Sequence, residues 1–333
     1  MKPFVPPKRP CLASIVIRTF NESEHLPRLL EAMRSQELGE GLDLEIVVVD
    51  SGSTDNTVEI SREFECRIKH IRKEDFSFGY SLNVGCEFAN GDVLVFVSGH
   101  CIPASNTWLR ELVAPLIDNV AQYSYGRQIG AETTKFSETQ IFAKYFPEHS
   151  MLPQDGFFCN NANAAITRGV WQQYQYNETL TGLEDLELAK RLVDDGGSVA
   201  YVASAPVHHI HDETWGQVRH RYEREAIAMQ DIVPNMQVNS VDAVRFFLSG
   251  VLNDFSVALS KRALAHNSPG ILAFRFMQYL GTYRGSRDHR KLSQAMKLRY
   301  YYPTPARVEP PNPNSSDAGD DGDVVPSNRS SAI

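Results

Sequence analysis

Two hydrophobic patterns divide the first hundred residues of this chain. Continuous apolar runs predict buried strands at 13–18, 44–49, 67–71 and 92–97. Between them, apolar residues three or four positions apart predict helices that begin near residues 26, 56 and 81. Near-continuous strands that alternate with helices are typical of an α/β fold with a mostly parallel sheet flanked by helices on both faces.

The rest of the chain is more helical. Loops and short strands fill residues 123–202, with a helix at 184–193 and a strand at 198–202, and further helices are predicted at 215–231, 241–266 and 271–283. The segment after residue 302 has six prolines and no aromatic residue, so it cannot support a core. We therefore expect an N-terminal extension (1–11), an α/β domain (12–235), a helical C-terminal region (236–302) and a disordered tail (303–333).

Composition narrows the class of protein. A formal charge of -8 argues against a nucleic-acid partner, which needs a strongly basic face. Five cysteines without CxxC spacing are typical of reduced thiols in a cytoplasmic protein. No continuous apolar run approaches the roughly 20 residues of a membrane span, and the proline-rich N-terminus does not read as a secretory signal.

Polar loops follow three of the predicted strands and begin at Arg18, Asp50 and Ser98. Sheets of this kind bind ligands beyond the carboxyl ends of their strands, so these loops are the candidate binding edge. Local structure offers alternatives, because Asp50 can close an Asx turn and the spacing of Thr19 and Glu22 fits a capping box.

Four motifs in order carry a resemblance: Thr19-Phe20-Asn21-Glu22, the run that ends in Asp50-Ser-Gly-Ser-Thr-Asp, Asn83 before Gly91-Asp92, and Glu184-Asp185. Together they resemble family 2 glycosyltransferases of the GT-A fold over about residues 12–225. The resemblance implies that the first two loops hold a nucleotide-diphosphate-sugar donor. The donor-binding residues that it implies are Thr19, Asn21, Glu22, Asp50, Ser53, Asn83, Ser98 and Gly99.

The family places a D-x-D metal motif at the end of the fourth strand, where this chain has Ser98-Gly99-His100. This segment is similar to a Ser-Ala-His type variant of the family. An imidazole suits Mn²⁺ better than Mg²⁺, so the resemblance implies a divalent metal, Mn²⁺ rather than Mg²⁺, at His100. The alternative is a hydrogen bond from His100 to the diphosphate without a metal.

Three later histidines, His208, His209 and His211, lie within four residues and offer further metal ligands. In an extended segment His209 and His211 point to the same face, which makes them the favoured pair, with loop packing as the alternative. Because imidazole must be neutral to bind a metal, metal-supported activity is expected to decline below about pH 6.

Catalysis is expected at Glu184 and Asp185. Alone, an acidic pair in a first helical turn only complements the helix dipole. In inverting members of the family, the residue at the Asp185 position deprotonates the acceptor hydroxyl, while Glu184 would bind the acceptor or orient the base. The segment 159–164 resembles the acceptor side. Arg224 on a basic helix can neutralise the departing diphosphate, unless that helix is simply solvated.

The resemblance thus implies an inverting, hexosyltransferase-like enzyme of surface glycan or polysaccharide synthesis, with a glycan or lipid-linked glycan as acceptor. A catalytically silent nucleotide-sugar binding protein is the alternative, since the D-x-D acids are missing. A nucleotidyltransferase would show a Gly-rich basic loop after the first strand, which 18–23 lacks. Cations between Arg284 and Arg299, followed by three tyrosines, predict peripheral contact with an anionic inner membrane face or, alternatively, a solvated helix end.

Overall fold

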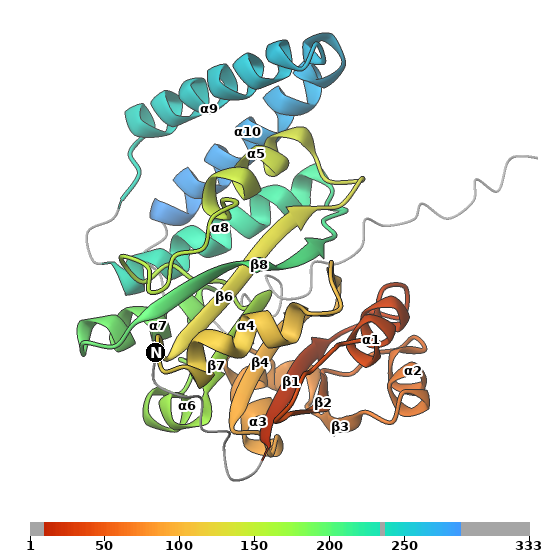
Figure 1. Ribbon diagram of the computed structural model, residues 1–333. Coiled ribbons are helices and arrows are strands. Elements are labelled where there is room, and N and C mark those ends of the chain that lie inside the picture. Colours follow the sequence, from red (N-terminus) through yellow and green to blue (C-terminus); the bar gives the residue numbers. More distant parts are fainter. Residues whose placement is uncertain (1–9, 234–236, 288–333) are drawn as a thin grey trace, which may run out of the picture. The chain divides into compact units, whose positions relative to one another are not determined.

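The computed structural model describes residues 10–233 and 237–287 (Figure 1). Within them lies an eight-stranded sheet with the order β3-β2-β1-β4-β7-β6-β8-β5. Its strands are β1 (Cys11–Thr19), β2 (Leu42–Asp50), β3 (Arg67–His70), β4 (Val93–Ser98), β5 (Cys101–Pro103), β6 (Tyr123–Gly130), β7 (Asn163–Thr167) and β8 (Val199–His209).

The two halves of the sheet differ in direction. Strands β3, β2, β1 and β4 are parallel, as the alternating strand and helix pattern predicts. In the other half, β7 is antiparallel to both neighbours and β5 is antiparallel to β8, whereas β6 and β8 are parallel. The α/β class with a helical C-terminal region is confirmed, and the sheet is mixed because short antiparallel strands join its second half.

Helices cover both faces of the sheet (Figure 1). They are α1 (Leu26–Arg34), α2 (Thr57–Glu63), α3 (Phe78–Phe88), α4 (Trp108–Ile117), α5 (Phe136–Tyr145), α6 (Arg168–Tyr174), α7 (Glu184–Asp194), α8 (Trp215–Ile232), α9 (Ser240–Ser260) and α10 (Leu264–Arg287). Alternate residues of β1 enter two apolar clusters, since Ile15 and Ile17 pack with α1 and α4 while Val16 packs with α3. Burial on both faces explains the unbroken apolar runs of the parallel strands.

The C-terminal helices correct one prediction. A single helix over 241–266 is wrong, because α9 ends at Ser260 and α10 begins at Leu264. The chain turns at Arg262, whose φ of 55° lies in the left-handed region. No glycine or proline marks this turn, so no local signal predicts it. Helix α10 packs on both α8 and α9 and ties the helical region to the sheet domain.

The structure bears on three further predictions, which concern the N-terminal boundary, the cysteines and membrane-spanning helices. Cys11 already belongs to β1, one residue inside the predicted extension 1–11. All five cysteines are free, in agreement with reduced thiols. Helix α9 is long and apolar enough to cross a membrane, by length and composition alone. No continuous apolar run in the sequence predicts this. The predicted tail, 303–333, and the cations after Arg287 lie outside the described residues.

Candidate active site

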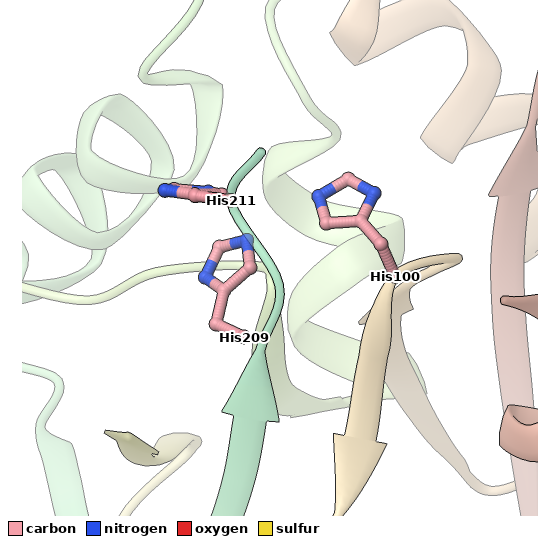
Figure 2. A group of neighbouring side chains, drawn as sticks. All are labelled: His100, His209 and His211. Atoms are coloured by element: carbon pink, nitrogen blue, oxygen red, sulfur yellow. The ribbon is translucent and has the colours of Figure 1, made fainter. Parts of the chain in front are cut away.

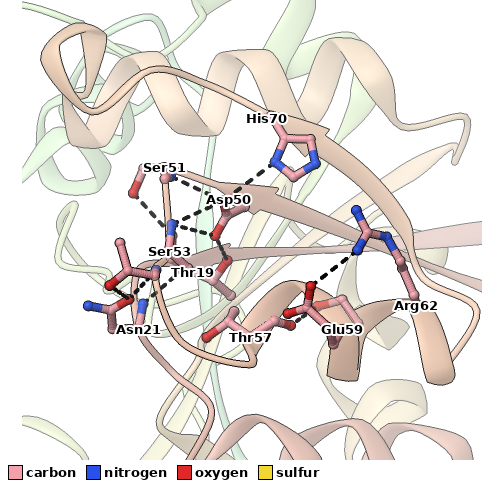
Figure 3. A network of polar contacts seen from close by, with 12 residues as sticks. Thr19, Asn21, Asp50, Ser51, Ser53, Thr57, Glu59, Arg62 and His70 are labelled. Carbon is pink, nitrogen blue, oxygen red and sulfur yellow. Dashed lines mark hydrogen bonds and ion pairs between the residues drawn. The ribbon is translucent and has the colours of Figure 1, made fainter. Parts of the chain in front are cut away.

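The first two loops meet at the carboxyl ends of β1 and β2, where Thr19 pairs with Asp50 (Figure 3). The Asp50 carboxylate is 2% exposed and accepts hydrogen bonds from the backbone N–H groups of Gly52 (3.1 Å) and Ser53 (3.2 Å). The Thr19 hydroxyl donates to it at 3.4 Å, and Nδ1 of His70 lies 3.4 Å away. The Asx turn is therefore present, and a nucleotide contact by Asp50 stays a prediction.

Side chains of each loop bind the backbone of the other. The Asn21 N–H donates to Oγ of Ser53 at 2.9 Å, and the amide oxygen of Asn21 accepts from the Thr54 N–H at 2.8 Å. The Glu22 N–H donates to the Thr57 hydroxyl at 2.8 Å. Asn21 has a φ of 57°, a conformation that asparagine tolerates better than most residues. These bonds hold the two loops together as one polar edge (Figure 3).

Three histidines gather beside this edge, where β5 begins and β8 ends (Figure 2). His100 precedes β5, His209 is the last residue of β8, and His211 follows two residues later. One ligand nitrogen from each can lie within 4.8 Å of the other two. His208 points to the opposite face and is exposed. We call His100, His209 and His211 the histidine cluster.

Each ring of the histidine cluster is held through Nδ1. That atom lies 3.2 Å from Oε1 of Glu22 in His100, 2.7 Å from Oε1 of Gln128 in His209, and 2.7 Å from Oε1 of Glu138 in His211. These oxygens are acceptors, so Nδ1 donates and a neutral ring keeps its lone pair on Nε2. Such partners orient histidines that bind metals in proteins.

One atom of the histidine cluster lacks a partner. Nε2 of His209 is buried, and no hydrogen-bond partner for it lies within the described chain. A buried ring nitrogen without a partner costs free energy unless a ligand satisfies it. Gly99 also contributes, because a Cβ atom there would lie 2.9 Å from Cγ of Glu22 and push that side chain away from His100. The donor set and its orphan nitrogen fit a transition-metal ion.

The electrostatics keep two of these rings neutral. Burial, chiefly, and the neighbouring rings and Arg221 hold the pKa of His209 and of His211 well below 6.5. Arg221 is itself bound, since its Nη2 donates to Glu138 at 2.5 Å and to Glu213 at 2.7 Å. These two rings are therefore held in the neutral form that binds a metal. The decline of metal-supported activity below about pH 6 stays a prediction.

Glu184 and Asp185 open α7, and both are buried. Oδ2 of Asp185 accepts from the Asn161 N–H at 2.8 Å, so the acidic pair touches the segment 159–164. Burial, first, and the Glu184 charge, second, raise the pKa of Asp185 from 3.8 to about 7. A carboxyl group that titrates near neutral pH is suited to act as a general base.

Two arginines lie beside the acidic pair. Nη1 of Arg18 lies 3.4 Å from Oε1 of Glu184 and donates to the Phe78 carbonyl at 3.3 Å. The guanidinium groups of Arg18 and Arg224 lie 5.0 Å and 4.7 Å from the centre of the Phe78 ring. Nε of Arg224 is buried without a hydrogen-bond partner among the described residues. The site therefore pairs two carboxyl groups with two cations.

Asn83 lies apart from these groups. Its amide nitrogen donates to the Tyr176 carbonyl at 2.9 Å, and its amide oxygen accepts from the Tyr176 N–H at 2.9 Å and from Nε1 of Trp171 at 3.1 Å. This side chain fastens α3 to the segment after α6. A donor contact by Asn83 stays a prediction. Ser98 sits at the end of β4, next to the loop of His100.

Residues 14–174 match the family model described as glycosyl transferase family 2. Over these residues the chain is similar to that family. The resemblance that the loop motifs carry is confirmed at the level of the family. The match ends before Glu184, so the roles of Asp185, Arg224, His209 and His211 are not tested by it.

The curated relatives of this domain are glycosyltransferases by their names. The chain is 27% identical over 222 residues to the O-antigen chain rhamnosyltransferase RfbN of Salmonella typhimurium, covering 63% of this chain and 69% of the relative. It is 27% identical to the O-antigen chain rhamnosyltransferase WbaN of Salmonella anatum, covering 54% and 60%. It is 32% identical to the glycosyltransferase AglE of Haloferax volcanii, covering 31% and 34%.

Solved glycosyltransferases share the fold. The mannosyltransferase PcManGT from Pyrobaculum calidifontis, solved with GDP-Man and Mn²⁺, superposes with a TM-score of 0.59 at 14% identity, covering 86% of this chain and 90% of that chain. Glucosyl-3-phosphoglycerate synthase from Mycobacterium tuberculosis gives a TM-score of 0.50 at 18% identity, covering 68% and 82%. At these identities the likeness supports the GT-A type fold.

Sequence reasoning did not identify three residues that position the histidines and the acidic pair. Gln128, Glu138 and Arg18 come from β6, α5 and β1, and none belongs to a motif. Gln128 meets His209 because β6 pairs in parallel with β8, a register that no local pattern predicts. A signal existed for Arg18, since it is a charged residue at the end of a buried strand, the binding edge of such sheets.

Proposed function

We propose that this protein is an inverting glycosyltransferase that moves a sugar from a nucleotide-diphosphate-sugar donor to a hydroxyl group of a glycan acceptor. The observation that carries the proposal is the pairing of two features at one sheet edge: the histidine cluster with its unsatisfied nitrogen, and the buried acidic pair at the start of α7. A GT-A type fold puts donor and acceptor at this edge.

Asp185 is the general base of the proposed reaction. Its carboxylate removes the proton of the acceptor hydroxyl as the oxygen attacks the anomeric carbon, opposite the departing nucleotide diphosphate. The Asn161 and Leu186 N–H groups each donate to one carboxylate oxygen, which orients the group toward the segment 159–164. Glu184, which lies 3.4 Å from Arg18, raises the basicity of Asp185 through its charge.

The histidine cluster is proposed to hold a divalent metal, with Ser98-Gly99-His100 in place of the D-x-D motif. Nε2 of the rings supplies the ligand atoms, while Glu22, Gln128 and Glu138 fix the rings through Nδ1. When bound, the metal stabilises negative charge on the leaving diphosphate. Imidazole ligands favour Mn²⁺ over Mg²⁺. The name of the Mn²⁺-bound PcManGT supports a metal in this fold.

Two groups complete the donor side. Arg224 is proposed to neutralise the diphosphate as it leaves, since its buried Nε has no other partner in the described chain. The loops of Thr19, Asn21, Glu22, Asp50 and Ser53 are proposed to cradle the nucleotide, with the network between them keeping that edge rigid.

The acceptor is proposed to be a growing surface glycan or polysaccharide, free or linked to a lipid, and the enzyme is proposed to be cytoplasmic, at the inner membrane face. The names of the O-antigen chain rhamnosyltransferases RfbN and WbaN support glycan chains as the class of acceptor and a hexose or deoxyhexose as the transferred sugar. Donor base and sugar depend on pocket shape rather than on motifs.

The test is a donor screen with purified protein. UDP-, GDP- and dTDP-sugars are incubated with Mn²⁺, and release of nucleotide diphosphate is followed with and without glycan acceptors. We expect one donor class to be consumed by the natural protein and not by Asp185→Asn. Binding of a nucleotide sugar without turnover under any acceptor would instead support the catalytically silent binding protein, which the buried acidic pair argues against.

A further inference from the structure

Helix α9 has three distinct faces. Val251, Asp254 and Ala258 are buried, on the side where α9 packs against α10. A second face is polar and exposed. The third face is a row of aliphatic residues at helical spacing, each between 52% and 74% exposed, which we call the α9 stripe: Val241, Val244, Leu248, Leu252 and Leu259.

The polar face makes α9 amphipathic on its exposed side. Arg245, Ser249, Asn253 and Ser256 are all exposed and follow one another along this face. An exposed apolar row next to a polar row is the arrangement of helices that lie in the plane of a membrane surface. Large apolar patches on a protein surface mark sites of interaction.

Charge distinguishes a lipid surface from other occupants. Residues 240–287 contain six Arg or Lys and two Asp, a net charge of +4 in a chain of -8. One of the two acids, Asp254, is paired with Arg275 at 2.7 Å and buried. The exposed cations Arg245, Lys261 and Arg262 therefore stand near the α9 stripe with little opposing charge. This complements an anionic bilayer.

The packing of α9 favours lying on the bilayer rather than crossing it. Its inner face holds the Asp254–Arg275 ion pair and contacts α10, so a spanning α9 would carry that pair into hydrocarbon or lose it. Immersing only the α9 stripe removes aliphatic surface from water and leaves the ion pair in the protein.

We propose that the α9 stripe inserts into the boundary between headgroups and acyl chains of an anionic phospholipid bilayer, with Arg245, Lys261 and Arg262 against the lipid phosphates. This surface differs from the basic segment that begins at Arg284, because it is aliphatic and lies on α9. The readout of the test below is lipid binding, so it does not depend on the proposed transferase reaction.

The docking surface connects to the candidate active site through packed helices. Helix α10 packs on α8, which carries Arg221 and Arg224, and α5, which carries Glu138, contacts both α9 and α10. A bound α9 therefore holds the site at a fixed height above the membrane. Under the proposed function, this geometry suits an acceptor whose reacting sugar is tethered to a lipid.

The experiment measures co-sedimentation of the full chain with vesicles of phosphatidylglycerol and phosphatidylcholine, and with vesicles of phosphatidylcholine alone. We expect binding to the anionic vesicles that weakens with salt. The variant Leu248→Glu/Leu252→Glu should bind at least about tenfold more weakly, because two leucines no longer leave water. The matched control, Ser249→Glu/Asn253→Glu, adds the same charge on the polar face and should lose far less affinity.

A second variant guards against misfolding. Trp at position 252, in Leu252→Trp, should shift its fluorescence to shorter wavelength on addition of anionic vesicles, whereas Trp in Asn253→Trp should not. Equal vesicle binding by the natural chain and the stripe variant overturns the proposal. A natural chain that binds no vesicles also overturns the proposal. So does light scattering that shows self-association of the natural chain and none of the stripe variant, because the α9 stripe would then join two copies.

Discussion

The two loops that follow β1 and β2 and the histidine cluster are both polar regions at the same sheet edge. They differ in how their hydrogen bonds are satisfied. The loops bind each other, and the buried carboxylate of Asp50 accepts from Thr19, Gly52 and Ser53. In the histidine cluster, Nδ1 of every ring has a partner but Nε2 of His209 has none among the described residues. The loops satisfy the Asp50 carboxylate within the chain, whereas the histidine cluster leaves one buried nitrogen without a partner among the described residues.

This difference predicts that changes in the second region alter chemistry more than stability. The largest effect is expected outside both regions, for Asp185→Asn, which removes the proposed base and should lower kcat by about 10² to 10⁴. Affinity for the donor nucleotide, measured by calorimetry, should change by only a few-fold. Asp194→Asn, at the exposed end of the same helix, should leave kcat unchanged, and near-normal turnover by Asp185→Asn would refute the assignment of the base.

The next largest effect is expected for the side chains that accept hydrogen bonds from Nδ1 of the histidines. Gln128→Leu removes the acceptor of Nδ1 of His209 without changing charge, and should weaken Mn²⁺ affinity by about 10- to 100-fold. Gln122→Leu is the control, because Gln122 accepts a comparable bond from the Ser198 N–H far from any histidine of the cluster. Equal loss of Mn²⁺ affinity in both variants would mean that the effect is general destabilisation.

The pH dependence of kcat tests the role of Asp185. A base acts only when ionised, so kcat should fall as the pH drops through about 7, where Asp185 takes up its proton. The Glu184 charge helps to raise this pKa, so Glu184→Gln should lower it and move the acid limb of the profile to lower pH. An unmoved limb in this variant would assign the titration to another group.

The smallest catalytic effect is expected in the two loops. Asp50→Ala leaves the donors from Gly52, Ser53 and Thr19 without an acceptor and should lower the free energy of unfolding by about 2 kcal/mol. Nucleotide affinity should fall with it, while kcat at saturating donor stays within a few-fold. Asp43→Ala, exposed on the same strand, is the control, and unchanged stability and affinity in Asp50→Ala would remove Asp50 from both roles.

The sequence predicts the fold and the two loops better than it predicts the surroundings of the histidine cluster. Local sequence signals predict the fold class and the loops. Continuous apolar runs mark strands β1, β2 and β4, and turn residues mark the turn at Asp50. The alternation of His209 and His211 also predicted their shared face. The partners Gln128 and Glu138 were not predictable, because β6 and α5 reach the histidines only through long-range packing. The turn at Arg262 had no glycine to signal it.

The central claim is that the histidine cluster is the metal centre of a glycosyltransferase, and Mn²⁺ binding tests it most directly. Free Mn²⁺ is measured by electron paramagnetic resonance during titration of the natural chain and of His209→Ala, and sugar transfer is followed in parallel with and without EDTA. We expect one Mn²⁺ per chain, lost in His209→Ala, and transfer that EDTA stops and that Mn²⁺ restores better than Mg²⁺. Full transfer in EDTA, or equal Mn²⁺ binding by the variant, would contradict it.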